Sequence, residues 1–253
     1  MNLISYATHL NPHYEECDFY HTMEIPGHSK VTGQWDLRPN IDVYVGHTDF
    51  AGKRVLEVGP ASGFLTHHME KLGADVVSVE IPISQGWDIV PRPDQKEAYL
   101  AVRQGHMRRL QNSFWFLHHA AKMKSQVLYS RVMDVPSSIG KFDVSMIASI
   151  LLHSRDPMGI LCKCAELTTK RMVITELLLN PKEQLDPQNR YIKLVPSIQN
   201  NVSDVWYQIS PQLIVDLLMV LGFTKFNFFT HDQYYEAAKS QAPHYTLVAE
   251  RET

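Results

Sequence analysis

Apolar residues form short, nearly continuous runs along most of the chain, and stretches with helical spacing separate these runs. Such runs are typical of strands that are buried on both faces of a sheet. Seven strands are predicted, at residues 54–59, 74–81, 126–132, 142–149, 171–177, 224–230 and 245–251. Helices are predicted between them, at 64–73, 94–124, 156–169 and 210–223. The alternation predicts an α/β fold, with a Rossmann-like mixed sheet and helices on both faces.

Residues 1–50 do not share this alternation. They are rich in His, Tyr and Pro, and the stretch WDLRPNIDVYVGHTDF at their end predicts a short helix. We therefore expect a lid or cap segment at 1–50 and one domain at 51–253. Within that domain, a helical insertion is expected at about 90–124.

The composition excludes several classes of protein. Of the 253 residues, 44% are hydrophobic and 20% are charged, which is ordinary for a globular protein. No apolar run reaches the roughly 18 residues of a membrane span. The first residues lack a secretory signal, so we expect a cytoplasmic protein with no membrane partner. The small, odd number of three cysteines argues against a disulfide scaffold, and we expect no metal site.

The net charge of −3 does not favour nucleic acid as a partner, since proteins that bind it are usually basic. Residues 94–124 have the opposite charge balance, with six Lys and Arg and only two carboxylates. We interpret this segment as a solvated helix face, and a patch for an anionic substrate is the alternative. Monomer and homodimer both remain open.

The segment LEVGPASGFLTHHMEKLGADVVSVE, residues 56–80, carries the clearest chemistry. Its first turn follows a strand, and in an open parallel sheet ligands bind at that end of the strands. Gly59 and Gly63 allow close backbone approach there, and the helix that follows offers free N–H groups. Glu80 ends the second strand, where a carboxylate can accept hydrogen bonds from ribose hydroxyls. These features fit a nicotinamide cofactor or S-adenosylmethionine.

Glu57 and the spacing of the glycines separate these two cofactors. The dinucleotide fingerprint is G-x-G-x-x-G, whereas here the two glycines are four apart and Ala61 stands between them. A pyrophosphate beside Glu57 would be repelled. The ammonium and sulfonium groups of S-adenosylmethionine would be attracted. The turn therefore favours S-adenosylmethionine.

The segment VLEVGPASG resembles motif I of the class I S-adenosylmethionine-dependent methyltransferases, with Ala61 at the middle glycine. The resemblance extends from about residue 50 to the end, and it identifies 51–253 as a methyltransferase domain. It implies a seven-stranded sheet whose last strand runs antiparallel between the fifth and the sixth. It also implies that Asp134 and Val135 lie at the adenine, and that S-adenosylhomocysteine is the product.

Three later segments are similar to a narrower group, the bacterial tRNA wobble-uridine carboxymethyltransferases and their small-molecule relatives. They are SILLHSRDPMGIL, RMVITELLL and RYIKLVPSIQNNVSDVWYQISPQLIVDLLMVLGF. The tRNA enzymes have a basic surface and a large helical N-terminal region, whereas this chain is slightly acidic and has about 50 residues before motif I. We therefore expect methyl transfer to an oxygen or nitrogen of a small molecule.

Three other functions stay open. The chain could methylate tRNA or another RNA, with residues 94–124 as the contact. It could be an NAD-dependent oxidoreductase, with which Glu80 is compatible and the glycine spacing is not. It could also be a non-catalytic subunit that binds S-adenosylmethionine, because methyl transfer by positioning alone leaves little trace in a sequence.

Two residues are candidates for a general base. His153 follows the fourth predicted strand, so its imidazole is expected on the cofactor side, where it could take a proton from an attacking hydroxyl or amine. Glu176, near the end of the fifth strand, is the second candidate.

Further candidates flank the cofactor. In the segment GQWDLRP, Trp35 could cover the cofactor and Arg38 could pair with its carboxylate. The substrate side is expected to include one histidine from each of two segments and an aromatic pair. These residues are His21, His119, Trp206 and Tyr207.

Overall fold

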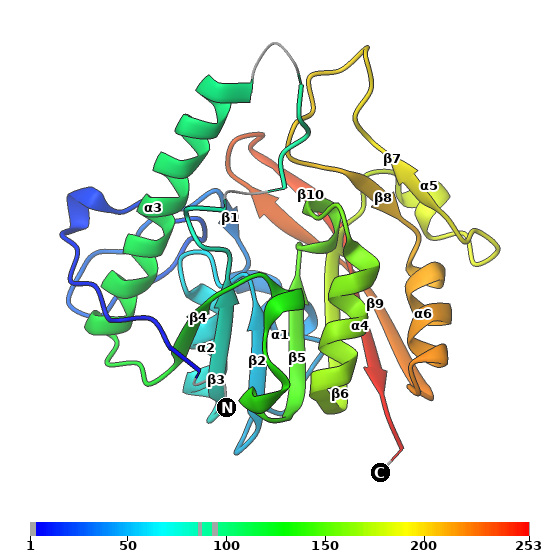
Figure 1. The fold of residues 1–253 in the computed structure, drawn as a ribbon, viewed down its shortest axis with the longest axis horizontal. Coiled ribbons are helices and arrows are strands. Elements are labelled where there is room, and N and C mark those ends of the chain that lie inside the picture. The colour runs from blue at the N-terminus through cyan, green and yellow to red at the C-terminus, as the bar shows by residue number, and fades with distance from the viewer. Residues whose placement is uncertain (1–3, 86–87, 93–95, 253) are drawn as a thin grey trace.

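The computed structural model describes residues 4–85, 88–92 and 96–252. An eight-stranded sheet runs through its centre in the order β1-β9-β10-β6-β5-β2-β3-β4 (Figure 1). Its strands are β1 (Trp35–Asp36), β2 (Arg54–Val58), β3 (Asp75–Glu80), β4 (Gln126–Tyr129), β5 (Phe142–Ala148), β6 (Thr168–Leu177), β9 (Lys225–Tyr235) and β10 (Ser240–Glu250). A separate hairpin pairs β7 (Ile192–Leu194) with β8 (Tyr207–Ile209).

The helices are α1 (Ile41–Tyr44), α2 (Phe64–Lys71), α3 (Lys96–Ala120), α4 (Pro157–Leu167), α5 (Pro181–Gln184) and α6 (Pro211–Val220). Short 3-10 turns include η2 (Arg38–Asn40), η3 (Val132–Asp134) and η5 (Leu151–His153). The strand order and the alternation with helices confirm the predicted fold class. None of the helices in the described ranges is both long enough and apolar enough to cross a membrane.

All seven strands expected from the sequence are present, and β1 adds an eighth. The strands from β2 to β6 pair in parallel, while β10 pairs antiparallel with both β6 and β9. The expected count of seven is therefore corrected to eight. The reason is that Trp35 and Asp36, expected in the lid, pair with Tyr235 and Tyr234 at the free edge of β9.

Some boundaries differ from those expected. The strand predicted over 126–132 ends at Tyr129, because the chain turns into η3 at Val132. The strand predicted over 224–230 continues to Tyr235, because it pairs with β10 along its whole length. The helix predicted over 94–124 ends at Ala120, and its expected start lies outside the described residues.

The sheet is buried on both faces, which explains the continuous apolar runs. Leu56 and Val58 of β2 pack in a cluster with residues of α4 and α6 on one face. Val55 points to the other face and packs with residues of α1 and α2. Both layers of helices are visible in Figure 1.

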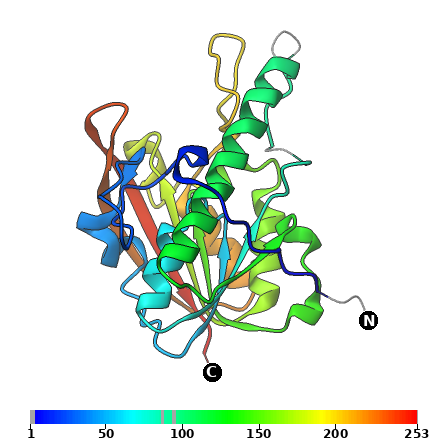
Figure 2. The same cartoon turned by 90° about the vertical axis from the view of Figure 1, so that its left-hand side faces the viewer.

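The N-terminal segment runs beside α3, as Figure 2 shows. The backbone N–H of Asp18 donates to Ser113 Oγ at 2.7 Å, and the side chain of Arg109 donates to the carbonyl of Cys17. Further along, His21 and Trp35 form an isolated bridge. A Cβ added to Gly33 would lie 2.3 Å from the backbone carbon of His21, so the chain crosses itself there without room for a side chain.

Candidate active site

A cavity of about 1160 Å³ opens where the carboxyl ends of the parallel strands meet. This is the edge at which ligands bind in open α/β sheets. We divide its lining into two parts. The turn half consists of Gly59, Ala61, Glu80 and Asp134, which follow β2, β3 and β4. The cover half consists of His21, Trp35, Tyr44, Tyr235 and His244, which come from the N-terminal segment, α1, β9 and β10.

The turn after β2 is tightly bent. Gly59 and Gly63 have φ of 72° and 86°, and Ala61 between them also has a positive φ of 48°. Only glycine adopts this region without steric cost, so Ala61 is held there by its neighbours. A Cβ on Gly59 would lie 2.4 Å from Ile150 Cδ1. Gly59 and Ala61 line the cavity, whereas Gly63 is buried at the start of α2.

Glu80 lies at the cavity, at the end of β3. Its Oε1 accepts the backbone N–H of Ile81 at 2.8 Å, and the N–H of Ala61 also donates to the carboxyl. Burial raises the pKa of Glu80 to about 7 despite these donors. The carboxyl therefore has capacity left to accept hydrogen bonds from a ligand.

Glu57 lies outside the cavity lining and beneath the turn. Its Oε2 accepts hydrogen bonds from Thr66 Oγ1 at 2.5 Å and from Ser78 Oγ at 2.6 Å. Its Oε1 is buried with no hydrogen-bond partner in the described residues. Burial raises the pKa of this carboxyl to about 7. Glu57 thus links α2 to β3 through its hydrogen bonds with Thr66 and Ser78, and it can affect the turn only indirectly.

The two residues expected at an adenine are placed differently. Asp134 is exposed at the end of η3 and lines the cavity. Val135 is buried and belongs to the apolar cluster that also contains Leu56 and Val58. Its backbone follows Asp134 directly, but its side chain packs into the core.

Trp35 and Arg38 are also separated. Trp35 lines the cavity and stacks on Tyr235, with ring centroids 4.5 Å apart. Arg38 lies outside the lining. Its guanidinium pairs with Asp36 at 2.6 Å and 2.8 Å, and this pairing lowers the pKa of the Asp36 carboxyl.

The two candidate bases differ in access. His153 is in η5 and lines the cavity, and its Nδ1 lies within hydrogen-bond distance of the carbonyl of Asp204. Burial lowers its pKa, so the ring is neutral at physiological pH. Glu176 is buried outside the lining, and its Oε1 accepts the N–H groups of Ile150 and Leu151 at 3.0 Å and 2.8 Å. Glu176 therefore fixes the loop after β5.

The residues expected on the substrate side are scattered. His21 is buried and lines the cavity, and burial lowers its pKa to about 3. His119 is exposed, and its Nε2 is 2.6 Å from the carbonyl of Leu10, away from the cavity. Trp206 and Tyr207 are not among the residues that line the cavity. The indole N–H of Trp206 donates to the carbonyl of Asp88.

Sequence reasoning missed the part of the cover half that belongs to β9, β10 and α1. Tyr44, Tyr235 and His244 all line the cavity. The signal was available: the last strand was expected to run antiparallel, so its beginning must lie at the carboxyl ends of its neighbours. His244 pairs with Leu177 at the end of β6.

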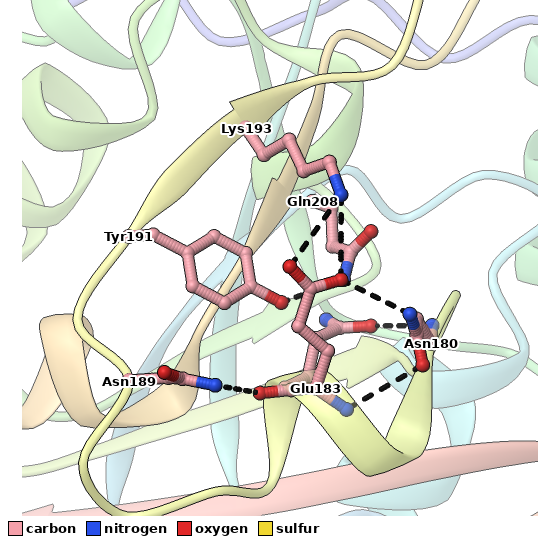
Figure 3. A network of polar contacts seen from close by, with 7 residues as sticks. Asn180, Glu183, Asn189, Tyr191, Lys193 and Gln208 are labelled. Carbon is pink, nitrogen blue, oxygen red and sulfur yellow. Dashed lines mark hydrogen bonds and ion pairs between the residues drawn. The ribbon is translucent and has the colours of Figure 1, made fainter.

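A polar network outside the cavity supports the segment that carries Asp204. Figure 3 shows Glu183 at its centre, with its Oε2 accepting hydrogen bonds from Asn180 at 3.0 Å and Gln208 at 3.3 Å. Lys193 reaches the same carboxylate at 3.4 Å. The network joins α5 to the β7–β8 hairpin.

Some of the basic residues of the 94–124 segment form ion pairs or hydrogen bonds with other parts of the chain. Arg103 lines the cavity and pairs with Asp204, while Arg109 donates to the carbonyls of Glu15 and Cys17. The expected solvated face is therefore incomplete, because α3 also anchors the N-terminal segment. Among the described residues, no group of three or more His, Cys, Asp and Glu is placed to hold a metal ion.

Comparisons with known proteins bear on the fold. No family model matches the chain. A tRNA U34 carboxymethyltransferase from Pseudomonas putida is 25% identical over 182 residues, which are 70% of this chain and 48% of that protein. The chain thus spans about half the length of the curated relative that it matches.

Solved structures share the architecture at low identity. The N-terminal domain of EvdMO1, solved with S-adenosylhomocysteine and D-fucose, superimposes with a TM-score of 0.56 at 16% identity, over 91% of this chain and 90% of that one. The 1,6-didemethyltoxoflavin-N1-methyltransferase of Burkholderia thailandensis gives 0.51 at 16% identity, over 86% and 78%. The magnesium protoporphyrin IX methyltransferase of Synechocystis gives 0.52 at 14%, over 85% and 81%. The chain therefore has the Rossmann-like fold of the class I methyltransferases, as the resemblance of motif I implied.

Proposed function

We propose that this protein is a methyltransferase that uses S-adenosylmethionine to methylate an oxygen or nitrogen of a small molecule. The observation that carries the proposal is the turn half, where the bent turn at Gly59 and Ala61 and the carboxyl of Glu80 face one cavity. The cofactor would supply a methyl group on a sulfonium, which a nucleophile takes by in-line displacement. S-adenosylhomocysteine in all three of the similar structures described above supports the same cofactor.

The residues of the turn half fit this cofactor group by group. Glu80 would accept hydrogen bonds from the ribose hydroxyls, and Asp134 would accept one from the adenine amino group, with the backbone of Val135 beside it. Ala61 and Gly59 would let the backbone approach the methionine part. Glu57 would act on the turn through Thr66 and Ser78.

The cavity is large enough for two ligands. Ordinary ligand sites hold roughly 300–1,000 Å³, and this cavity has about 1160 Å³. The turn half would hold the cofactor, which leaves the remainder for an acceptor. His153 would lie beside the acceptor and take its proton, while Glu176 holds the loop that carries His153.

We infer that part of the N-terminal segment is a lid. His21 and Trp35 line the cavity from above the sheet, and hydrogen bonds from Asp18 and Arg109 fasten this segment to α3. A lid over this edge would favour a small acceptor over a folded RNA, which would need an open approach to the same edge. The rest of the chain, 51–253, would be the methyltransferase domain.

Transfer of a labelled methyl group tests the proposal. The protein would be incubated with methyl-labelled S-adenosylmethionine and either a small-molecule extract or bulk tRNA. We expect label in a compound of low mass, and loss of that label with E80A. Label in the tRNA fraction would replace the small-molecule acceptor by RNA. No label in either fraction, together with no cofactor binding, would contradict the proposal.

A further inference from the structure

The cover half contains a histidine that the proposed mechanism has not used. His244 has a relative exposure of 2% and lines the cavity from the start of β10. Its Nδ1 lies 2.9 Å from the carbonyl of Ala242. A carbonyl can only accept, so Nδ1 carries the proton, and Nε2 of the neutral ring is left with a lone pair. Within the described part of the chain, Nε2 makes no hydrogen bond.

The neighbours of His244 keep the ring neutral and in place. His231 stacks on it at 5.8 Å with planes 9° apart, and Trp35 meets it edge to face at 5.4 Å. Burial lowers the pKa of His244 to about 4. A neutral imidazole in this tautomer can accept one hydrogen bond from a ligand and can donate none toward the cavity.

The lining beside His244 is aromatic, and among the described residues the one charged group that acts on its pKa is the carboxylate of Asp232, outside the lining. The rings of Trp35 and Tyr44 lie 5.4 Å and 6.1 Å from the ring of His244, and Tyr235 stacks on Trp35. The charged residues of the described lining all belong to other elements. They are Glu80, Asp88, Arg103, Arg131, Asp134, Arg155 and Asp204. Burying a charged ligand against the cover half would therefore be costly, whereas a flat apolar ring would pack on it.

We propose that the cover half is the acceptor subsite and takes an uncharged aromatic hydroxyl compound, whose O–H donates to Nε2 of His244. The inference rests on the proposed methyltransferase function, since it names the class of acceptor. As the hydroxyl oxygen bonds to the transferred methyl carbon, the bond from that carbon to sulfur breaks and its electron pair stays on sulfur. The hydroxyl proton passes to Nε2 of His244, which takes the place of His153 as the base for this class of acceptor, and from there to solvent.

Nitrogen-15 spectra of the histidine rings test this contact without any activity. Phenol is the probe, added to the protein with and without S-adenosylhomocysteine. We expect the Nε2 signal of His244, assigned by its loss in H244F, to move as phenol binds. Benzoate, which has the same ring with a charge, should leave the signal unmoved. A phenol titration that does not move this signal would overturn the inference.

Variants supply a second measurement of the same contact. H244F keeps a ring of similar size without an acceptor, so phenol affinity should fall about tenfold, the scale of one hydrogen bond. H119F removes an exposed histidine outside the cavity and should leave phenol affinity unchanged. Equal affinity of H244F and the wild type would contradict the proposal. If H244F does not fold, H244Q supplies both the assignment of the signal and the affinity comparison.

Calorimetry with S-adenosylhomocysteine separates this inference from the function on which it rests. If the cofactor product binds and phenol does not move the His244 signal, the acceptor class is wrong and the cofactor assignment stands. If phenol moves the signal and no cofactor product binds, the aromatic subsite stands and methyl transfer is wrong. D-fucose in place of phenol must bind more weakly, because tighter binding of the sugar would overturn the aromatic class.

Discussion

The turn half and the cover half of the cavity are built in different ways. The residues of the turn half that carry most of its chemistry lie between Gly59 and Glu80, in one strand–turn–helix–strand unit. The cover half draws on His21, Trp35 and His244, which are far apart in the chain and meet only through the edge pairing of β1, β9 and β10. A unit that is contiguous in the chain has a residue spacing that can be recognised in the sequence, whereas a surface built from distant segments has no such spacing. Because the two halves come from different segments, substitutions in the cover half that change the acceptor need not disturb the cofactor site.

Loss of the Glu176 carboxyl should have the largest effect, because the loop that it fixes contacts both halves. It contacts Gly59 of the turn half through Ile150, and Tyr44 of the cover half through Ser149. In E176A, the N–H groups of Ile150 and Leu151 would be buried without an acceptor. We expect the free energy of unfolding to fall by roughly 3–5 kcal/mol, measured by urea denaturation. E183A, in the network outside the cavity, is the control and should cost less. A loss below 1 kcal/mol in E176A would mean that the loop does not depend on this carboxyl.

The pH dependence of stability should separate the two halves. Glu57 and Glu80 have folded-state pKa values raised to about 7, so their stabilising contribution is complete below the unfolded value of 4.5 and is lost as the pH rises through 7. His21 and His244 have folded-state pKa values lowered to about 3 and about 4. Their contribution is present above 6.5 and is lost as the pH falls.

Unfolding free energies measured from pH 4 to 8 check this separation. We expect E57Q to remove roughly 1–3 kcal/mol of a decline in stability as the pH rises from 4.5 to 7. H244F should remove a decline of the opposite sense, which develops as the pH falls from 6.5 to 4. The separation fails if both variants change the slope of the profile with the same sign.

The ribose contact is expected to matter for the turn half alone. E80A should weaken the binding of S-adenosylhomocysteine by roughly 1–3 kcal/mol, the scale of hydrogen bonds to a charged group, and leave phenol binding unchanged. Calorimetric titration of each ligand measures both effects. An unchanged affinity for S-adenosylhomocysteine would remove Glu80 from the ribose site.

A substitution at Gly33, where the chain passes close to the backbone of His21, tests whether the cover half can be disturbed without loss of cofactor binding. A Cβ there would meet the backbone of His21 at 2.3 Å, and a backbone contact cannot relax as a side-chain end can. We expect G33A to weaken phenol binding and to lower the unfolding free energy by about 1–2 kcal/mol. Its affinity for S-adenosylhomocysteine should stay within a factor of about three. A loss of both ligands together would mean that the halves are not separable. G105A, at a glycine in α3 with an ordinary φ and open space around it, is a matched comparison.

Arg38 is expected to have the smallest effect. It pairs with Asp36 and lies outside the lining, so R38A should leave cofactor binding unchanged and cost at most about 1 kcal/mol of stability. A tenfold loss of affinity for S-adenosylhomocysteine in R38A would instead show that Arg38 leaves Asp36 to bind the carboxylate.

The same contrast explains what the sequence could predict. Buried parallel strands and a Gly-containing turn have local signatures, so the strands of the sheet and the placement of Gly59, Ala61 and Glu80 at the cavity could be predicted from the chain. The position of the antiparallel last strand was implied only by the resemblance to the methyltransferases. Glu57 was expected near the ligand, and only the packing of Thr66 and Ser78 shows that its side chain lies beneath the turn.

The cover half could be predicted only in part. Trp35 and His21 were expected at the site because they precede motif I. Tyr44 and His244 were missed because their immediate neighbours in the sequence resemble core segments, and only the antiparallel direction of the last strand indicates that His244 lies at this edge. Trp206, in contrast, was expected on the substrate side because it is aromatic. It does not line the cavity, and its indole N–H donates to the carbonyl of Asp88.

Calorimetric titration of the protein with S-adenosylhomocysteine and, separately, with NADH tests the central claim most directly. The turn half should bind S-adenosylhomocysteine and should not bind NADH, because a pyrophosphate would meet carboxyl groups and a turn without the dinucleotide spacing. Binding of NADH alone would contradict the proposed cofactor and would favour an NAD-dependent oxidoreductase instead.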